Sequence, residues 1–278
     1  MPELPEVETV RLSIQKNLIG SVITAIDIHQ RKLRQKIPLN FKQKLLKQKI
    51  FAVHRRGKYL LISTSYGIII IHLGMSGRLL VKDITPKRTK HEHVTMTLSN
   101  GKLLSLIDPR RFGLVLWIKT LNHPVLKKLG KEPLTKDFSH DYLYNAAQKR
   151  KITIKQLIMD NRIVAGIGNI YASEALFAAK IYPLTPANKL NSKQCQILVT
   201  KIKSILKSAI KNRGTTFRDY VDGSGMSGNF QKYLKVYGRE NQPCKSCRTK
   251  LQNIKIGQRN TIYCLKCQNQ GNESQPSL

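Results

Sequence analysis

Acidic residues are scarce in this chain of 278 residues: Asp and Glu number 16, whereas Lys and Arg number 49. The formal net charge of +33 does not stabilise a compact fold, because like charges repel one another. Such a surplus favours a polyanionic partner, and nucleic acid explains it better than an anionic membrane surface does. A generally lysine-rich proteome is the alternative. The hydrophobic fraction of 41% provides for a sizeable core and excludes wholesale disorder.

Long apolar runs are also missing. The most apolar short stretch, residues 67–73, is far below the roughly 20 residues that a membrane-spanning helix requires. The N-terminus opens with Pro and Glu rather than with a basic and then an apolar segment, so we expect no secretory signal. We therefore expect a cytoplasmic protein without a membrane partner.

Cysteines are few, but four of the five lie in two close pairs. The spacing Cys244-x2-Cys247-x16-Cys264-x2-Cys267 fits a zinc site in which two hairpin knuckles supply two thiolates each. Such a closed site organises the local fold and performs no catalysis, so we predict one structural Zn²⁺. Four free cysteines are the alternative. We expect Cys195, the fifth, to be a small core residue.

The apolar pattern changes along the chain and predicts an α+β protein. The first half is expected to form a helix beginning at Pro5, with one apolar face marked by Val7, Val10, Ile14 and Leu18. A second helix at 38–48 and an N-terminal antiparallel β-sandwich are also expected. Its strands are expected at residues 22–28, 50–53, 59–63, 68–73, 79–81, 93–98, 102–107 and 112–118. Asn100-Gly101 is a strong hairpin signal between two of them. The second half favours helices at 137–148, 152–160, 169–179 and 192–212, followed by a glycine-rich loop.

Basic residues are concentrated in two runs that contain no acid. Residues 31–58 hold eleven Lys and Arg, and residues 189–213 hold seven. Each run alone is equally well explained as a solvated surface. Two such runs in different halves of the chain favour the flanks of one groove for a polyanion.

The N-terminus carries a candidate nucleophile. Removal of Met1 would leave Pro2 as a free secondary amine, and an α-amino group with an ordinary pKa of about 7.7–8.0 is partly unprotonated near neutrality. Such an amine can attack an aldehydic carbon and form an iminium ion, with Glu3 as acid or base. The alternative is structural, because Pro and Glu also begin helices well.

Two glycine-flanked turns follow strands and carry large side chains. Met75 and Phe112 would suit wedges that enter a DNA base step, although either would be a core residue if buried. A third turn, residues 161–169, contains Gly-x-Gly but follows no strand, so a dinucleotide site is a poor explanation. Asn169 is expected to cap the next helix, whose N-terminal amides favour phosphate.

Together these motifs make the chain resemble the formamidopyrimidine-DNA glycosylase family, the bacterial 8-oxoguanine DNA glycosylases and AP lyases. The resemblance runs to about Gln268 and includes the opening 2–8, the Met75 and Phe112 turns, residues 168–174 and the four cysteines. It implies an N-terminal β-sandwich with flanking helices, a helix–two-turn–helix module and a four-cysteine zinc-finger hairpin. The implied domains are residues 1–123 (catalytic), 124–136 (linker), 137–233 (helix–two-turn–helix), 234–268 (zinc finger) and 269–278 (polar tail).

The resemblance also implies a role for individual residues. Pro2 would attack C1′ of the damaged nucleotide, Glu3 would assist ring opening, and Lys58 would donate a proton in β-elimination. Arg259 would act in δ-elimination and hold a phosphate. The implied DNA contacts are His91, Arg110, Arg150, Met75, Phe112, Lys155 and Asn169, and residues 215–228 would cover the extruded base. The implied partner is damaged double-stranded DNA, bound by a monomer without an obligate protein partner.

Two other functions remain open at this point. An endonuclease-eight-type glycosylase for oxidised pyrimidines would share Pro2, Glu3 and the zinc finger. Leu4 and the Met75 and Phe112 turns argue against it. A non-catalytic zinc-ribbon protein that binds DNA would explain the charge and the cysteines, but it leaves Pro2, Glu3 and Lys58 without a purpose.

Overall fold

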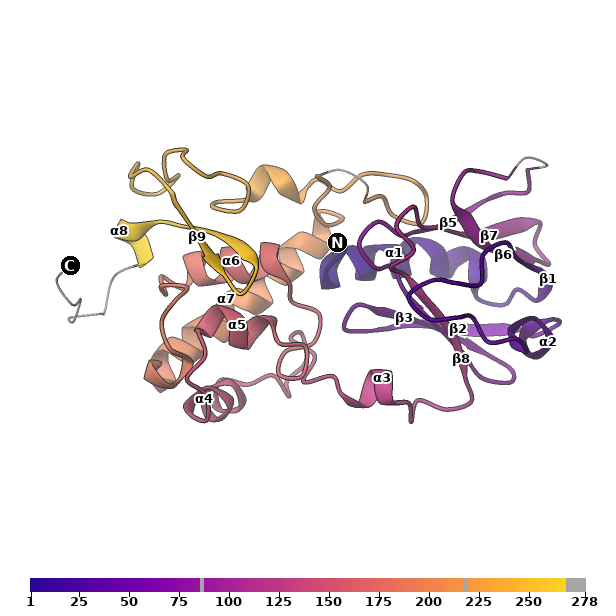
Figure 1. Ribbon diagram of the computed structural model, residues 1–278, viewed down its shortest axis with the longest axis horizontal. Coiled ribbons are helices and arrows are strands. Elements are labelled where there is room, and N and C mark those ends of the chain that lie inside the picture. Colours follow the sequence, from indigo (N-terminus) through magenta and orange to yellow (C-terminus); the bar gives the residue numbers. More distant parts are fainter. Residues whose placement is uncertain (86–87, 218–219, 269–278) are drawn as a thin grey trace. The chain divides into compact units, whose positions relative to one another are not determined.

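The computed structural model describes residues 1–85, 88–217 and 220–268, so the predicted polar tail at 269–278 lies outside the described residues. The chain divides into two compact units (Figure 1). The first comprises Met1–Lys128 and Ala209–Gln231, and the second comprises Leu129–Ser208 and the chain from Lys232 onward. Within the described residues, no helix is long and apolar enough to cross a membrane.

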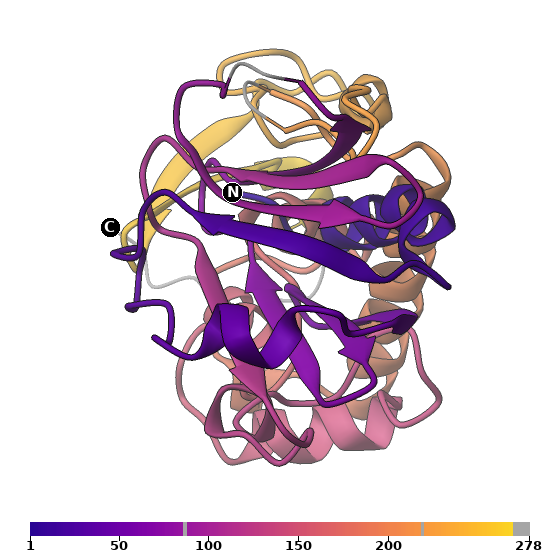
Figure 2. The same cartoon turned by 90° about the vertical axis from the view of Figure 1, so that its right-hand side faces the viewer.

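The first unit contains an antiparallel β-sandwich, as the sequence predicts. One sheet has the order β1-β6-β7-β5 and the other has the order β2-β3-β4-β8. In Figure 2 the two sheets lie one above the other. The strands are β1 (Ile23–Ile28), β2 (Ile50–Arg56), β3 (Tyr59–Thr64), β4 (Ile68–His72), β5 (Arg78–Asp83), β6 (Glu92–Leu98), β7 (Lys102–Ile107) and β8 (Leu114–Ile118).

Helix α1 (Leu4–Leu18) packs into the core of this unit. Its buried face is the predicted one: Val7, Val10, Ile14 and Leu18 are at most 1% exposed and share one cluster with residues of both sheets. Because its core-facing positions recur at helical spacing, the helix is fixed along its whole length. The N-terminus of the chain is thereby held at a defined place beside the sandwich.

Turns set the ends of several elements. The Asn100-Gly101 hairpin is confirmed: it joins β6 to β7, and Gly101 adopts φ +78°. The strand expected from residue 112 begins only at Leu114, because the N–H of Gly113 donates to Asp108 within a turn. The helix expected at 38–48 is reduced to α2 (Phe41–Leu45), since Leu46 is extended and Lys47 adopts φ +64°. The short helix α3 (Pro124–Lys127) lies in the expected connector.

The second unit is mainly helical, also as predicted. It contains α4 (His140–Gln148), α5 (Ile154–Met159), α6 (Asn169–Ala178) and most of α7 (Ser192–Lys211). Ser139 caps α4 through the N–H of Tyr142, and Thr153 caps α5 with Gln156 as its capping-box partner. The remaining elements are two 3₁₀ helices, η1 (Ala187–Lys189) and η2 (Phe230–Tyr233), the hairpin strands β9 (Gln252–Ile256) and β10 (Arg259–Tyr263), and α8 (Leu265–Gln268).

A small core supports the hairpin at the end of the chain. Phe177 of α6 packs with Val236, Leu251 and Ile262 and with the paired cysteines. Cys195 is fully buried on α7, which confirms that it is a core residue. Burial raises the pKa of its thiol to about 11, so the side chain stays neutral.

Candidate active site

Pro2 and Glu3 lie at the start of α1 and are both buried. Glu3 occupies the N-cap, and its N–H donates to Oε2 of Glu6 at 2.8 Å. Met1 precedes them and is 47% exposed, so its removal would free the Pro2 nitrogen without disturbing the core. A buried acidic residue therefore directly follows the candidate amine in the chain, on a helix that cannot shift without repacking the sandwich.

Lys58 lies at the turn between β2 and β3, in the same unit. Gly57 adopts φ +55° there, and its carbonyl accepts a hydrogen bond from Nη1 of Arg55 at 3.0 Å. Nε of Arg55 also donates to Glu8 of α1 at 2.9 Å, so the turn is tied to the helix that carries Pro2. Burial alone would raise the pKa of Glu8, but Arg11 and Arg55 outweigh it and the pKa is lowered. The contact between the turn and α1 is therefore an ion pair between the Arg55 guanidinium and the Glu8 carboxylate.

His72 lies beside this turn at the end of β4. Its ring is 4.8 Å from that of Tyr59, and only 8% of the residue is exposed. Burial, followed by the positive charges of Lys58 and Arg34, lowers the pKa of His72 to about 4. The imidazole is therefore neutral at physiological pH. The Met75 turn motif begins at His72. Its proximity to Lys58 and Arg34 depends on how the strands pair, which the sequence alone does not show.

The candidate wedge residues are exposed rather than buried. Met75 is 42% exposed and Phe112 is 47% exposed, which excludes core roles for both. The guanidinium carbon of Arg110 lies 4.7 Å from the centre of the Phe112 ring, a cation–π distance. Arg110 and Phe112 thus form one tip.

Asp108 joins the two turns that carry the wedge. Its carboxylate accepts from the hydroxyl of Ser76 at 2.9 Å and from the N–H of Gly113 at 2.7 Å, and the residue is fully buried. A Cβ on Gly74 would meet the Phe112 carbonyl carbon at 2.5 Å, so the turns approach each other closely. His91, with φ +64°, accepts from the N–H of Asp108 through its carbonyl at 3.0 Å. His91 is therefore built into the same framework.

The other candidate residues lie in the second unit, where the hairpin is the main feature. Arg259 is exposed at the first position of β10. Gly257 and Gln258 turn the hairpin with φ +47° and +64°, a pair of left-handed residues typical of a tight hairpin turn. A pocket of about 180 Å³ lies beside Arg259 and is lined by that residue, Gly257 and residues of α5. The side chain of Arg259 therefore borders a small concavity.

Lys155 and Asn169 both contact the hairpin. Lys155 is 1% exposed, and its Nζ donates to the hydroxyl of Thr261 at 2.7 Å. Nδ2 of Asn169 donates to the carbonyl of Asn260 at 2.9 Å. The expected capping role of Asn169 is wrong: Gly168 is the N-cap of α6 and Asn169 is the first helical residue. Arg150 is half-buried after α4, and its Nη1 donates to the carbonyl of Ala146 at 2.7 Å.

The four paired cysteines converge as the spacing predicts. All four sulfur atoms lie within 4.8 Å of one another. Cys244 and Cys267 are 3.9 Å apart and Cys247 and Cys264 are 3.4 Å apart, close to the roughly 3.8 Å edge of a tetrahedron with Zn–S bonds of about 2.3 Å. The donor set and its spacing fit one structural zinc ion.

Models of known families match most of the chain. The formamidopyrimidine-DNA glycosylase N-terminal domain matches residues 1–115, the formamidopyrimidine-DNA glycosylase H2TH domain matches 129–221, and the zinc finger found in FPG and IleRS matches 241–270. The formamidopyrimidine-DNA glycosylase of Aliivibrio fischeri (strain MJ11) is 49% identical over 96% of this chain and 98% of its own length. The chain belongs to the formamidopyrimidine-DNA glycosylase family.

Other members of the formamidopyrimidine-DNA glycosylase family support the same conclusion. The protein of Stutzerimonas stutzeri (strain A1501) is 48% identical over 96% of this chain and its whole length. The Lactococcus lactis Fpg in complex with DNA containing an abasic site superposes with a TM-score of 0.88 at 34% identity, covering 96% of this chain and all of that one. The FPG protein of Thermus thermophilus gives a TM-score of 0.86 at 32% identity, with 98% and 100% covered.

Family membership confirms the resemblance, the fold class and the structural zinc. It also contradicts the non-catalytic zinc-ribbon alternative, because the glycosylase N-terminal domain model matches residues 1–115, ahead of the zinc finger. The domain boundaries and the roles of the individual site residues remain predictions. The candidate residues fall into two groups, with Pro2, Glu3, Lys58 and the wedge in one unit and the hairpin residues in the other.

Sequence reasoning missed several buried acids of this glycosylase, including Glu6 and Glu174. Glu6 is 1% exposed, and its Oε1 accepts from the N–H of Thr215 at 2.8 Å. Glu174 of α6 accepts from the N–H groups of Val236 and Tyr237 at 2.9 and 2.8 Å, and burial raises the pKa of its carboxyl group. The only sequence signal was that each lies within a family motif. Their partners are far away along the chain, which local patterns do not reveal.

Proposed function

We propose that this protein is a base excision repair enzyme that removes oxidised purines from duplex DNA and then cleaves the abasic site. The observation that carries the proposal is the pairing of Pro2 with the buried carboxyl group of Glu3 at the anchored start of α1. Structural zinc does no chemistry, so the nucleophile must come from the chain's own residues. An N-terminal secondary amine provides one.

The first step is attack by the Pro2 nitrogen on C1′ of the damaged nucleotide. The bond from C1′ to the base breaks, and the base departs with the bonding electrons and a proton. Opening of the sugar ring then leaves an iminium ion between the Pro2 nitrogen and C1′. Glu3 supports this step by protonating the ring oxygen, a role that suits a buried acidic residue directly following the amine in the chain.

Cleavage of the strand follows from the iminium. Loss of a proton from C2′ to solvent expels the 3′ phosphate by β-elimination, and we assign to Lys58 the donation of a proton to the departing phosphate. A second elimination expels the 5′ phosphate, and we assign the phosphate contact in this step to Arg259. Water then hydrolyses the iminium, which breaks the bond between C1′ and the Pro2 nitrogen and restores the free amine. The products are a free damaged purine, an unsaturated sugar fragment and a one-nucleotide gap with phosphate at both ends.

Access to the base requires its extrusion from the duplex, which costs a few kcal/mol. We assign Met75, Arg110 and Phe112 to the space that the base leaves, because these side chains are exposed at rigid turns. His91, Arg150 and Asn169 would contact the DNA backbone. Lys155 would act on the backbone through the hairpin, since its ammonium group is buried against Thr261. Residues 215–228, of which 218 and 219 lie outside the described residues, would cover the extruded base.

Lesion preference is tested most simply with two substrates under single-turnover conditions. Duplexes with 8-oxoguanine opposite C and with thymine glycol opposite A should be compared at equal enzyme concentration. We expect the first to be processed at least about 10-fold faster, a difference of roughly 1.4 kcal/mol in transition-state stabilisation. Faster processing of thymine glycol would favour the endonuclease-eight-type alternative instead.

We further propose that the protein acts as a cytoplasmic monomer associated with DNA. The net charge of +33 supports association with a polyanion, and such charge also opposes self-association. Sedimentation of the protein alone and with a short duplex tests this. One copy per duplex is the expected result, and a stable dimer without DNA would contradict it.

A further inference from the structure

A segment more than 200 residues away in the sequence braces the helix that carries the proposed nucleophile. The N–H of Thr215 donates to Oε1 of Glu6 at 2.8 Å, while Oε2 of the same carboxylate accepts from the N–H of Glu3 at 2.8 Å. One buried side chain therefore joins the backbone of Thr215 to the residue that follows Pro2. A Cβ on Gly214 would lie 2.7 Å from Oε1 of Glu6, so the segment is in close contact with this carboxylate.

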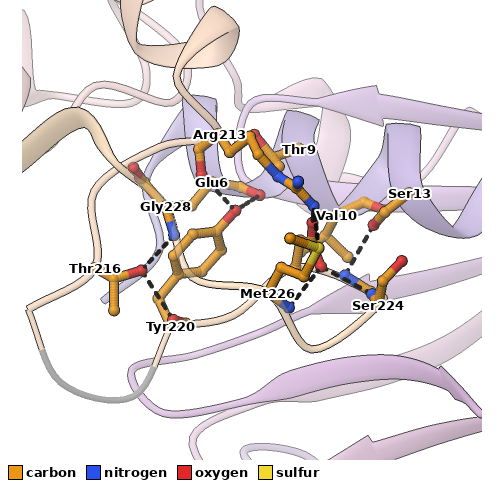
Figure 3. A network of polar contacts seen from close by, with 12 residues as sticks. Glu6, Thr9, Val10, Ser13, Arg213, Thr216, Tyr220, Ser224, Met226 and Gly228 are labelled. Atoms are coloured by element: carbon orange, nitrogen blue, oxygen red, sulfur yellow. Dashed lines mark hydrogen bonds and ion pairs between the residues drawn. The ribbon is translucent and has the colours of Figure 1, made fainter.

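The backbone just before Thr215 is held by an ion pair. Arg213 adopts φ +62°, a left-handed conformation that is costly for a residue with a side chain. Its guanidinium Nη2 contacts Oδ2 of Asp222, which is 1% exposed. The hydroxyl of Tyr220 lies 3.2 Å from both the Arg213 carbonyl and the Glu6 carbonyl, which closes the network shown in Figure 3.

Asp222 also organises the turn that follows it. Its Oδ1 accepts from the N–H of Ser224 at 2.9 Å and from the N–H of Met226 at 3.0 Å. The two oxygens of this carboxylate thus have different roles, since Oδ2 pairs with Arg213 and Oδ1 shapes the turn. Because Asp222 is buried, water cannot freely replace the ion pair. Loss of the pair would therefore cost stability.

The turn is seated on α1 at a second point. The N–H of Gly223 donates to the hydroxyl of Ser13 at 2.8 Å, and its carbonyl accepts from the N–H of Val81 at 2.8 Å. A Cβ on Gly223 would lie 2.2 Å from Cγ2 of Ile14, so only glycine allows this approach. The segment is thus anchored at two points on one helix, at Glu6 near its start and at Ser13 in its second half, and both side chains are labelled in Figure 3. Asp222 contributes to both anchors, because it pairs with Arg213 on one side and directly precedes Gly223 on the other.

We propose that Asp222 is a positioning residue for the N-terminal nucleophile. Through Arg213 it fixes the backbone leading to Thr215, and through Thr215 and Glu6 it fixes the backbone of Glu3 beside Pro2. This inference rests on the proposed role of Pro2. Displacement of a reacting amine by about 1 Å can reduce a rate by about 100-fold, so a remote anchor of this kind affects chemistry rather than binding.

The test uses the full chain with Met1 removed and a duplex that contains a pre-formed abasic site. Asp222→Asn removes the charge but keeps the shape and the Oδ1 acceptor. Asp83→Asn makes the same charge change at a side chain that is 82% exposed, so it is the matched control. Borohydride trapping under single-turnover conditions reports the rate of iminium formation, and equilibrium binding to DNA with a tetrahydrofuran abasic analogue reports affinity.

We expect Asp222→Asn to trap about 10-fold more slowly than the wild type, with DNA affinity within about two-fold. Asp83→Asn should match the wild type in both. Arg213→Lys, which keeps a cation opposite Asp222, should retain most of the rate, whereas Arg213→Met should match Asp222→Asn. The double variant with Asp222→Asn and Arg213→Met should trap no more slowly than either single variant, because the two side chains act as a unit.

Three results would overturn the positioning role. The first is a wild-type trapping rate in Asp222→Asn, and the second is equal loss of rate and DNA affinity. A third is a loss of base excision on 8-oxoguanine with normal trapping on the abasic duplex. That result would mean that the segment around Asp222 contacts the damaged base and does not position the Pro2 amine. If Asp222→Asn unfolds, Ser13→Ala weakens only the second anchor and should show the same selective loss. Absence of any adduct with the wild type would instead defeat the proposed function.

Discussion

The N–H of Gly74 donates a hydrogen bond to Nδ1 of His72 at 2.9 Å, where both residues lie just before the exposed Met75. Nδ1 must therefore be the acceptor in the neutral imidazole, which leaves the ring proton on Nε2. The two nitrogens thus have distinct roles: one fixes the start of the Met75 turn, and the other carries the ring proton. This arrangement requires that the ring remains uncharged.

The neutral His72 makes stability depend on pH in a defined window. Its pKa is lowered to about 4 by burial and then by Lys58 and Arg34, whereas the unfolded chain has an ordinary pKa of about 6.5. As pH falls from about 6.5 to about 4, the unfolded state takes up a proton that the folded state does not, so stability falls by up to about 3 kcal/mol. Above that window His72 contributes no pH dependence.

Urea unfolding at pH 7.5 and pH 5 checks this expectation. His72→Asn keeps an oxygen acceptor for the Gly74 amide but cannot titrate, so its loss of stability between the two pH values should be smaller than in the wild type. His140→Asn, at a half-exposed histidine of the other unit, is the matched control and should keep the wild-type slope. An unchanged slope in His72→Asn would contradict the assignment.

The wedge predicts a difference between two substrates. Phe112→Ala should slow base excision from a lesion duplex by at least about 10-fold, because unstacking a base step costs a few kcal/mol that the ring no longer offsets. Cleavage of an abasic site in flexible single-stranded DNA should change little. Phe51→Ala removes a similarly exposed ring from β2 and should leave both rates unchanged. Equal losses on both substrates in Phe112→Ala would refute the wedge.

Loss of one zinc ligand should loosen the hairpin that carries Arg259. Cys264→Ser leaves three thiolates, and its metal affinity should fall by at least about 10-fold, the scale at which even outer-shell changes act. DNA affinity should fall with it. Cys195→Ala changes the one cysteine outside the cluster and should retain zinc. Zinc content by mass spectrometry and DNA binding by anisotropy give the answer, and normal affinity without zinc would be inconsistent with this account.

The charge surplus predicts a steep dependence of binding on salt. If about six or more phosphates are contacted, affinity for duplex DNA should fall roughly 10³-fold or more between 50 and 200 mM salt, because bound counterions are released. Titrations at four salt concentrations give the slope. A nearly flat slope would mean that the charge of +33 serves another partner.

The sequence predicted the features that depend on neighbouring residues. The four cysteines, the Asn100-Gly101 hairpin and the buried face of α1 each follow from a local spacing that strongly favours one structure. Features that depend on distant contacts were not predictable. Glu6 meets Thr215 across 209 positions and Lys155 meets Thr261 across 106, and neither periodicity nor turn chemistry encodes such pairs.

Errors at element ends have a similar origin. Asn169 has the side chain of a good helix cap, yet Gly168 takes that position while the Asn169 amide group binds the hairpin carbonyl of Asn260. The tertiary contact outweighs the local preference. The strand expected from Phe112 begins later for a similar reason, since Asp108 holds Gly113 in a turn.

The central claim is that the N-terminal amine of Pro2 is the nucleophile. The most direct measurement is mass spectrometry of the peptide adduct after borohydride reduction of the enzyme bound to 8-oxoguanine duplex. We predict the adduct on the N-terminal peptide beginning with Pro2, and no adduct when Met1 is retained, because an amide nitrogen delocalises its lone pair and cannot attack C1′. An adduct on Lys58, or full base excision with Met1 verified in place, would contradict the account.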